Sequence, residues 1–149
     1  MTELRSAAER KADVLSALQQ HRDGWLATAS SGGIPHLIVV ATVWSDEGIL
    51  VATRIASRTA RNLRKNRRGR LALGQGDDAI VIDLDLERTL PARDAGAVAA
   101  AFTRAAGWDP ADEGADWCYL ILRPTRIQAY RGYAELAGRE VMHAGRWLA

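Results

Sequence analysis

The spacing of hydrophobic positions changes from helical to strand-like near residue 23. Leucine, valine and alanine recur at mostly helical spacing from Leu4 to Leu18, which predicts a leading amphipathic helix. Beyond Asp23 the chain shows short apolar runs, rich in β-branched residues and separated by turn-forming residues, as expected for strands. The predicted strands are residues 25–29, 35–44, 49–53, 71–73, 80–86, 117–122 and 126–130.

Two further helices interrupt these strands. Ser57 is a suitable N-cap for a helix that starts near Arg58. The alanine-rich segment Ala95–Ala106 predicts another helix, which Gly107 and Pro110 end.

The pattern predicts an antiparallel barrel, because many closely spaced strands with few helices do not suit a doubly wound sheet. In residues 80–86 the apolar positions alternate with Asp83 and Asp85, which places these carboxylates on a wet face. Pro124 separates the last two strands and either breaks the ladder or sits at a bulge. With 149 residues and 48% hydrophobic content, the chain can form one domain, residues 1–149, that is mainly β with flanking helices.

Positive charge is concentrated in one segment. Eight of the 20 lysine and arginine residues fall between Arg54 and Arg70, and no acidic residue lies in that window. A local positive field of this kind steers an anionic partner, either a small molecule or a nucleic acid, toward one edge of the protein.

The start of the basic segment has the makings of an anion site. If a strand ends at Thr53 and Ser57 caps the following helix, the free N–H groups of the first turn point outward with partial positive charge. Thr53 and Ser57 add hydroxyls, and Arg54 or Arg58 can grip phosphate oxygens with a planar guanidinium. A capped surface helix with solvated arginines is the alternative interpretation.

Signatures of catalysis by side chains alone are missing. The histidines at 21, 36 and 143 are far apart and lack metal-ligand spacing, so we expect no metal site. Catalytic residues stay unassigned, and we expect a cofactor to carry the chemistry. The lone Cys118 suits a reducing cytoplasm, and the absence of a signal peptide or a bilayer-length apolar run predicts a cytoplasmic protein without membrane contact.

The order of these elements resembles the flavin-binding split barrel of the pyridoxamine 5'-phosphate oxidase-like superfamily. The resemblance extends over most of the chain and rests on the order of the whole set rather than on one motif. It is carried by the leading helix, Trp25-Leu26-Ala27-Thr28 before a glycine turn and proline, Pro35 through Leu63 with Ser57-Arg58 and Asn62-Leu63, Arg139-Glu140-Val141-Met142 and Gly145-Arg146-Trp147-Leu148.

This resemblance implies a homodimeric split antiparallel barrel with a flavin-like ring at the subunit interface. By position, Thr53, Ser57 and Arg58 would meet the cofactor phosphate, with Arg54 and Asn62 beside them. The ring and ribityl chain would lie along His36, Leu37, Ile38, Val39 and Val40. Trp147 and Arg146 would wall the partner's site, or Trp147 would simply anchor the tail to the core.

The chain departs from the oxidases that make pyridoxal phosphate at His36, Ala41 and Thr59, where they carry basic residues. It looks closer to the actinobacterial branch that uses the deazaflavin coenzyme F-420, whose oligoglutamate tail would meet extra cations. Those cations are Arg61, Arg64, Lys65 and Arg67.

The resemblance thus implies an oxidoreductase that moves a hydride between reduced F-420 and an electron-poor conjugated organic acceptor. FMN or a haem-type tetrapyrrole in the same fold is the alternative ligand. A nucleic-acid-binding module is a further alternative, but few aromatic residues interleave with the arginines and no helix-turn-helix precedes them, so we expect no nucleic acid.

Overall fold

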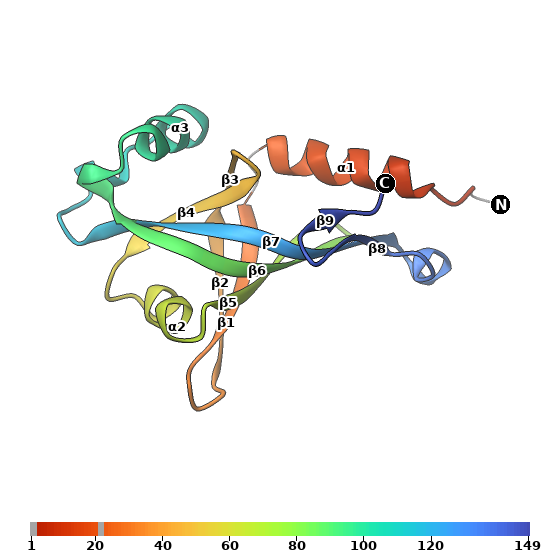
Figure 1. Cartoon of the computed structure of the whole chain (residues 1–149), viewed down its shortest axis with the longest axis horizontal. Coiled ribbons are helices and arrows are strands. Elements are labelled where there is room, and N and C mark those ends of the chain that lie inside the picture. Colours follow the sequence, from red (N-terminus) through yellow and green to blue (C-terminus); the bar gives the residue numbers. More distant parts are fainter. Residues whose placement is uncertain (1–2, 21–22) are drawn as a thin grey trace.

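The computed structural model describes residues 3–20 and 23–149, which form an antiparallel sheet flanked by helices (Figure 1). The α-helices are α1 (Ala7–Gln19), α2 (Arg58–Asn66) and α3 (Ala97–Ala106), and the short 3-10 helices are η1 (Ala92–Asp94), η2 (Pro110–Asp112) and η3 (Tyr133–Glu135). The strands are β1 (Asp23–Ala29), β2 (Pro35–Ala41), β3 (Val43–Ser45), β4 (Gly48–Arg54), β5 (Arg68–Leu73), β6 (Asp78–Pro91), β7 (Trp117–Arg131), β8 (Glu140–His143) and β9 (Arg146–Trp147).

The strand order places two consecutive strands at the two ends of the sheet path. The order is β2-β1-β5-β6-β7-β4-β3, and β8 and β9 extend it from β7. The two ends of the path, β2 and β3, are consecutive in the chain and only Thr42 lies between them. One large antiparallel sheet with flanking helices confirms the mainly β, split-barrel fold predicted from the sequence.

Three predicted strands have different extents in the structure. The run 35–44 is one strand in the sequence pattern, but it bends at Thr42 because β2 pairs with β1 and β3 pairs with β4. The prediction of two separate strands around Pro124 is wrong, since β7 runs through this residue without interruption. Pro124 pairs with Leu84 and Arg126 with Asp83, so Thr125 is the extra residue of a bulge, as the second interpretation had it.

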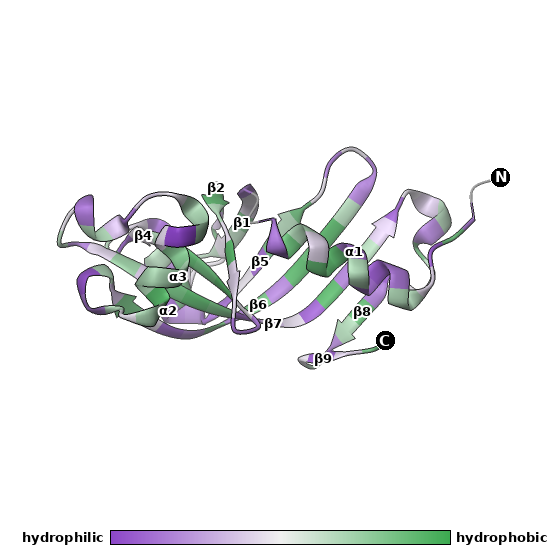
Figure 2. Ribbon diagram, turned by 90° about the horizontal axis from the view of Figure 1, so that it is seen from above, coloured by the Kyte–Doolittle hydropathy of each residue, from purple (hydrophilic) through white to green (hydrophobic). Residues whose placement is uncertain are grey.

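Alternation along the strands separates a packed interior from a polar exterior, which Figure 2 shows as bands of opposite hydropathy on the long strands. The main core contains Leu26, Leu71, Ile82 and Leu120, all fully buried, and α1 adds its apolar side to the same cluster. As predicted, Asp83 and Asp85 lie outside this core.

A second, smaller core lies under α3. Phe102 is fully buried there and meets Trp108 and Tyr119 edge to face, with ring centroids 5.4 Å apart in each pair. Such aromatic contacts add specific geometry to a large buried area. In Figure 1, α3 and α2 lie on opposite sides of the long strands.

Two arginines fasten α1 and the residues before it to the end of β7 and to η3. Arg10 donates to the carbonyl oxygens of Ala129 and Glu135 at 3.2 and 3.0 Å, and it is almost inaccessible to solvent. Arg5 forms a salt bridge with Glu135 at 2.7 Å. No described helix has the length and apolar content needed to cross a bilayer.

Candidate functional site

The turn between β4 and α2 forms the expected capped helix start. Ser57 has extended backbone angles, and its Oγ accepts a hydrogen bond from the Ala60 N–H at 3.1 Å. The Thr53 hydroxyl donates to Ser57 Oγ at 3.0 Å. The N–H groups of Arg58 and Thr59, at the first two helical positions, have no acceptor within the helix and lie at its positive end.

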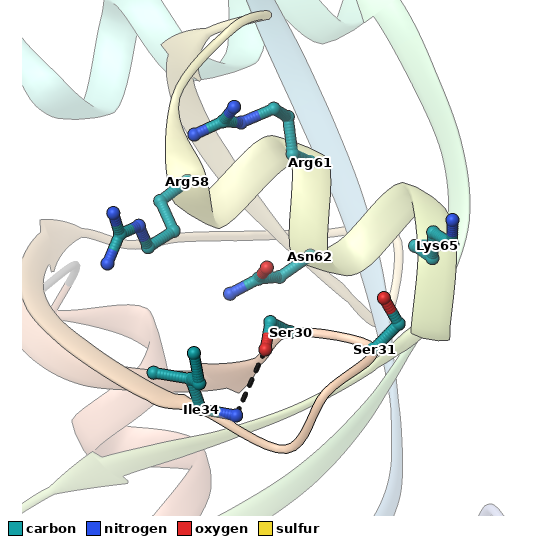
Figure 3. A pocket seen from close by; sticks show the side chains of 7 residues that line it. All are labelled: Ser30, Ser31, Ile34, Arg58, Arg61, Asn62 and Lys65. Carbon is teal, nitrogen blue, oxygen red and sulfur yellow. Dashed lines mark hydrogen bonds between the residues drawn. The ribbon is translucent and has the colours of Figure 1, made fainter.

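A cleft of about 350 Å³ lies between α2 and the turn that joins β1 to β2. Its walls are Arg58, Arg61, Asn62 and Lys65 from the helix and Ser30, Ser31 and Ile34 from the turn. Figure 3 shows α2 above the turn, with the Asn62 side chain between the two. The structure therefore brings the predicted residues Arg58, Arg61 and Asn62 to one cavity.

Two asparagines hold the β1–β2 turn against α2. Asn62 Nδ2 donates to Thr28 Oγ1 at 3.1 Å, and both residues are buried. Asn66 Nδ2 donates to the Ala29 carbonyl oxygen one turn further along the helix. These contacts fix the width of the cleft.

Four cations of the basic segment are bound to acceptors in the chain itself. Arg54 lies 3.9 Å from Asp116 and over the Trp117 ring. The guanidiniums of Arg64 and Arg67 donate to the carbonyl oxygens of Ile55 and Leu86 at 2.9 and 2.6 Å, and Arg70 pairs with Asp83 at 2.6 Å. Consequently Arg54 and Arg64, predicted as site residues, do not line the cleft.

The other four cations, Arg58, Arg61, Lys65 and Arg68, are exposed. Across residues 3–20 and 23–149, no side-chain hydrogen bond or ion pair engages them. Three of the four line the cleft. Its positive charge is therefore not neutralised by the protein.

The predicted ring-binding residues His36 to Val40 occupy β2, whose side chains point alternately to opposite faces. His36 pairs with Thr28 and so lies on the same face of the hairpin as the Thr28–Asn62 contact, together with Ile38 and Val40. Leu37 and Val39 point the other way and are exposed. The five residues therefore divide between two surfaces.

The opposite surface of the β1–β2 hairpin is an exposed apolar patch. Trp25, Leu37 and Val39 keep 53%, 59% and 49% of their surface accessible, and Trp25 is directly paired with Val39. A single exposed apolar side chain is common on protein surfaces, whereas a cluster of three is typical of an interaction surface.

Trp147 is far from the cleft within its own chain. It packs against the main core, and Lys11 of α1 lies 5.2 Å above its ring. Figures 1 and 2 both place β9 near α1, at the other end of the molecule from α2.

Neither Cys118 nor His143 lines the cleft. Burial raises the pKa of the Cys118 thiol, and the charge of Arg64 only partly opposes this effect. His143 contacts Glu140 on the surface, and His21 lies outside the described residues. In the part of the chain that is described, no three histidine, cysteine, aspartate or glutamate side chains converge on a possible metal position.

Sequence reasoning did not identify Ser30, Ser31 and Ile34 as part of the site. They lie almost 30 residues before α2, and their only local signal is that of a turn. A turn signal does not indicate what packs against it.

A family model described as Pyridoxamine 5'-phosphate oxidase matches residues 11–114 of the chain. A search of curated proteins finds no match.

Similar solved structures include a reductase and two haem proteins. An F-420 reductase has a TM-score of 0.63 at 22% identity, over 75% of this chain and 93% of that one. HutZ, the haem storage protein of Vibrio cholerae, has a TM-score of 0.65 at 15% identity, over 92% and 99%. A haem-binding protein of Mycobacterium smegmatis has a TM-score of 0.68 at 22% identity, over 97% of this chain and 60% of that one. Identities this low establish a shared fold and no more.

Proposed function

Because the chain belongs to the pyridoxamine 5'-phosphate oxidase family, we propose that it is an oxidoreductase that holds coenzyme F-420 in the cleft between α2 and the β1–β2 turn. The observation that carries this proposal is the set of three cations, Arg58, Arg61 and Lys65, which line the cleft without any acidic partner. A site of this kind suits a small molecule with an acidic end.

The residues present fit a phosphate-bearing cofactor. The N–H groups at the start of α2 and the side chain of Arg58 are donors for phosphate oxygens, and Thr53 supports Ser57 as the cap. Arg61 and Lys65 follow on the same face of the helix and would meet the tail carboxylates of F-420. His36 and Ile38 lie on the face of β2 that would border the ring.

The active form is a homodimer in which a second copy covers the apolar patch of Trp25, Leu37 and Val39. About half or more of the surface of each side chain is exposed in one chain, and apolar anchors of this size occupy the centres of protein interfaces. The same docking would bring Trp147 of the partner subunit toward the cofactor, which its position within one chain does not allow.

When bound, the deazaflavin supplies a hydride for an electron-poor conjugated acceptor. The protein binds the acidic end, orients the ring along β2 and excludes water from the slot. None of the residues named here is required as an acid or a base, which agrees with the raised pKa of Cys118 and the surface position of His143.

A haem-type tetrapyrrole is a second candidate ligand, and FMN in the same cleft is a third. The haem candidate is favoured by the names of two similar structures, the storage protein HutZ and the haem-binding protein of Mycobacterium smegmatis. A tetrapyrrole also has acidic edges, which the basic cleft could accommodate.

Titration of the purified protein with F-420, FMN and haem, each followed by calorimetry, tests the proposal. F-420 should bind most tightly, and Arg58→Ala should weaken it by about 1.5–3 kcal/mol, the range for hydrogen bonds to a charged group. Arg104→Ala, which removes an exposed arginine from α3, is the matched control and should leave binding unchanged. A tighter fit for FMN or haem, or equal affinity in the Arg58 variant, would refute the assignment.

A further inference from the structure

Two segments that contain no acidic residue form one edge of the molecule. Residues 24–45, which make up the β1–β2 hairpin and β3, contain no aspartate or glutamate, and residues 54–70 contain eight cations and no acid. The other 12 of the 20 lysine and arginine residues share the rest of the chain with all 18 acidic residues. Figure 1 places the β1–β2 turn and α2 on one side of the long strands, and α1 and α3 on the other. Positive charge is therefore concentrated on one side of the protein.

The solvent side of α2 consists almost entirely of cations. Its exposed residues are Arg58, Arg61, Arg64, Lys65 and Asn66. Arg64 and the C-cap residue Arg67 donate to carbonyl oxygens, which leaves their charge in place. By contrast, Arg54 and Arg70 form ion pairs with acids, and Arg68 lies opposite Asp85 in the sheet. The remaining five cations, on α2 and its C-cap, have no acidic partner among the described residues.

The tip of the β1–β2 hairpin carries an exposed aliphatic side chain beside these cations. Ile34 follows two glycines and keeps 63% of its surface accessible. A Cβ built on Gly33 would meet no heavy atom within 4 Å, so the tip projects away from its described neighbours. Figure 3 shows the Ile34 side chain on the same side of the cleft as the Arg58 guanidinium. Ile34 is not part of the apolar patch of the proposed dimer.

We propose that this edge docks the protein on the surface of an anionic lipid bilayer. The cations of α2 face the lipid headgroups, and Ile34 enters the interfacial layer at the tip of the hairpin. Lysine and arginine are attracted to anionic lipid within about a Debye length of the surface, and an aliphatic side chain gains free energy on leaving water. The sequence prediction of no membrane contact rested on the lack of a spanning segment, which surface docking does not require.

The exposed aliphatic tip favours a bilayer over a nucleic acid. Ile34 would gain little from phosphates and sugars, whereas a bilayer offers it hydrocarbon next to the negative charge. No aromatic side chain lines the cleft between Ile34 and α2, although base stacking on aromatic rings is a main source of affinity for single strands. The edge therefore combines attraction to negative charge with a group that only an apolar phase accommodates.

Cosedimentation of the full chain with lipid vesicles tests the role of charge. At low salt the protein should bind vesicles of phosphatidylserine and phosphatidylcholine but not vesicles of phosphatidylcholine alone, and added salt should release it. Each cation contributes about five-fold to such binding, so Arg61→Gln combined with Lys65→Gln should weaken it about 10- to 30-fold. The matched control is Arg93→Gln combined with Arg104→Gln, which makes the same charge change at exposed positions of η1 and α3. It should change binding by less than about two-fold.

A second pair of variants tests the aliphatic tip. Ile34→Ser keeps every charge and should weaken binding to the anionic vesicles about three- to ten-fold, because less apolar surface leaves water. Leu148→Ser is its control, since Leu148 is similarly exposed, at 55%, and lies next to the C-terminus rather than on this edge. It should leave binding unchanged. Circular dichroism of each variant shows that the fold is retained.

Four results would overturn the proposal. They are equal binding to neutral vesicles, equal loss in the α2 and α3 variants, unchanged affinity of Ile34→Ser, and a duplex oligonucleotide that binds more tightly than the vesicles at the same salt concentration. Release by inorganic phosphate beyond that by sodium chloride at equal ionic strength would indicate a single phosphate site and overturn it as well. All measurements are made without F-420, so failure of the cofactor assignment would leave this inference standing.

Discussion

Replacement of Glu135 by glutamine tests the ionic contact between this buried residue of η3 and Arg5, which lies just before α1. The carboxylate accepts hydrogen bonds from the backbone N–H groups of Arg5 and Arg131, at 3.0 and 2.8 Å, and from the Arg5 guanidinium at 2.7 Å. The Arg5 contact holds the pKa of Glu135 at about 2, below its ordinary value of 4.5. The hydrogen bond to the Glu135 carboxylate in turn raises the pKa of Arg5 above its ordinary value, because it stabilises the charged guanidinium.

The expected loss in the free energy of unfolding follows from this difference in the pKa of Glu135. A change from 4.5 to about 2 corresponds to roughly 3 kcal/mol of preference for the charged form in the folded state. Removing one member of a buried pair costs a similar amount, about 3–5 kcal/mol. Glutamine keeps one oxygen acceptor, so we expect Glu135→Gln to lower the free energy of unfolding by about 2–3 kcal/mol at pH 7.

The effect should depend on pH with a defined sign. Because the folded pKa is lowered, the stabilisation is fully present above about pH 4.5 and is lost as the pH falls through about 2. The difference between wild type and variant should therefore stay constant from pH 8 to 5 and shrink toward pH 2. Urea unfolding followed by tryptophan fluorescence measures it at each pH.

Glu113→Gln is the matched control, because Glu113 is exposed and lies in the loop after η2. It should change the unfolding free energy by less than about 0.5 kcal/mol. A Glu135 effect as small as this, or one that grows as the pH falls, would refute the reasoning.

Two further predictions concern the site and the core. Asn62→Ala leaves the buried hydroxyl of Thr28 without its partner and should cost about 1–3 kcal/mol in urea unfolding, and the cost should fall in a Thr28→Val background. Strictly additive losses would show that the two side chains do not interact. Cys118 is buried and its thiol pKa is raised, so a disulfide reagent should modify it only as fast as the protein opens. Rapid modification of the folded protein would contradict the packing described for β7.

The sequence predicted those elements whose signals are local. The cap at Ser57, the helix that follows it and the end of α3 at Gly107 agree with the structure, because capping depends on residues within one turn. The alternation in β6 correctly assigned Asp83 to the outer face, since strand periodicity is also a local property.

Features that depend on distant partners were not predictable in this way. The short strands β8 and β9 pair with each other and with the end of β7, and no alternation long enough to reveal them exists in the tail. Arg64 and Arg58 are chemically identical in the sequence. Only the fold shows that the Ile55 carbonyl holds the first and that the second faces an open cleft.

The single residue between β2 and β3 limits how this protein can vary. One continuous stretch, 35–45, pairs with β1 in its first part and with β4 in its second part. An insertion or deletion of one residue there would reverse the inside and outside positions of everything that follows, including Val43, which is buried against the second core. Homologous chains can thus lengthen the loops at either end of this stretch, whereas its residue count must be inherited unchanged.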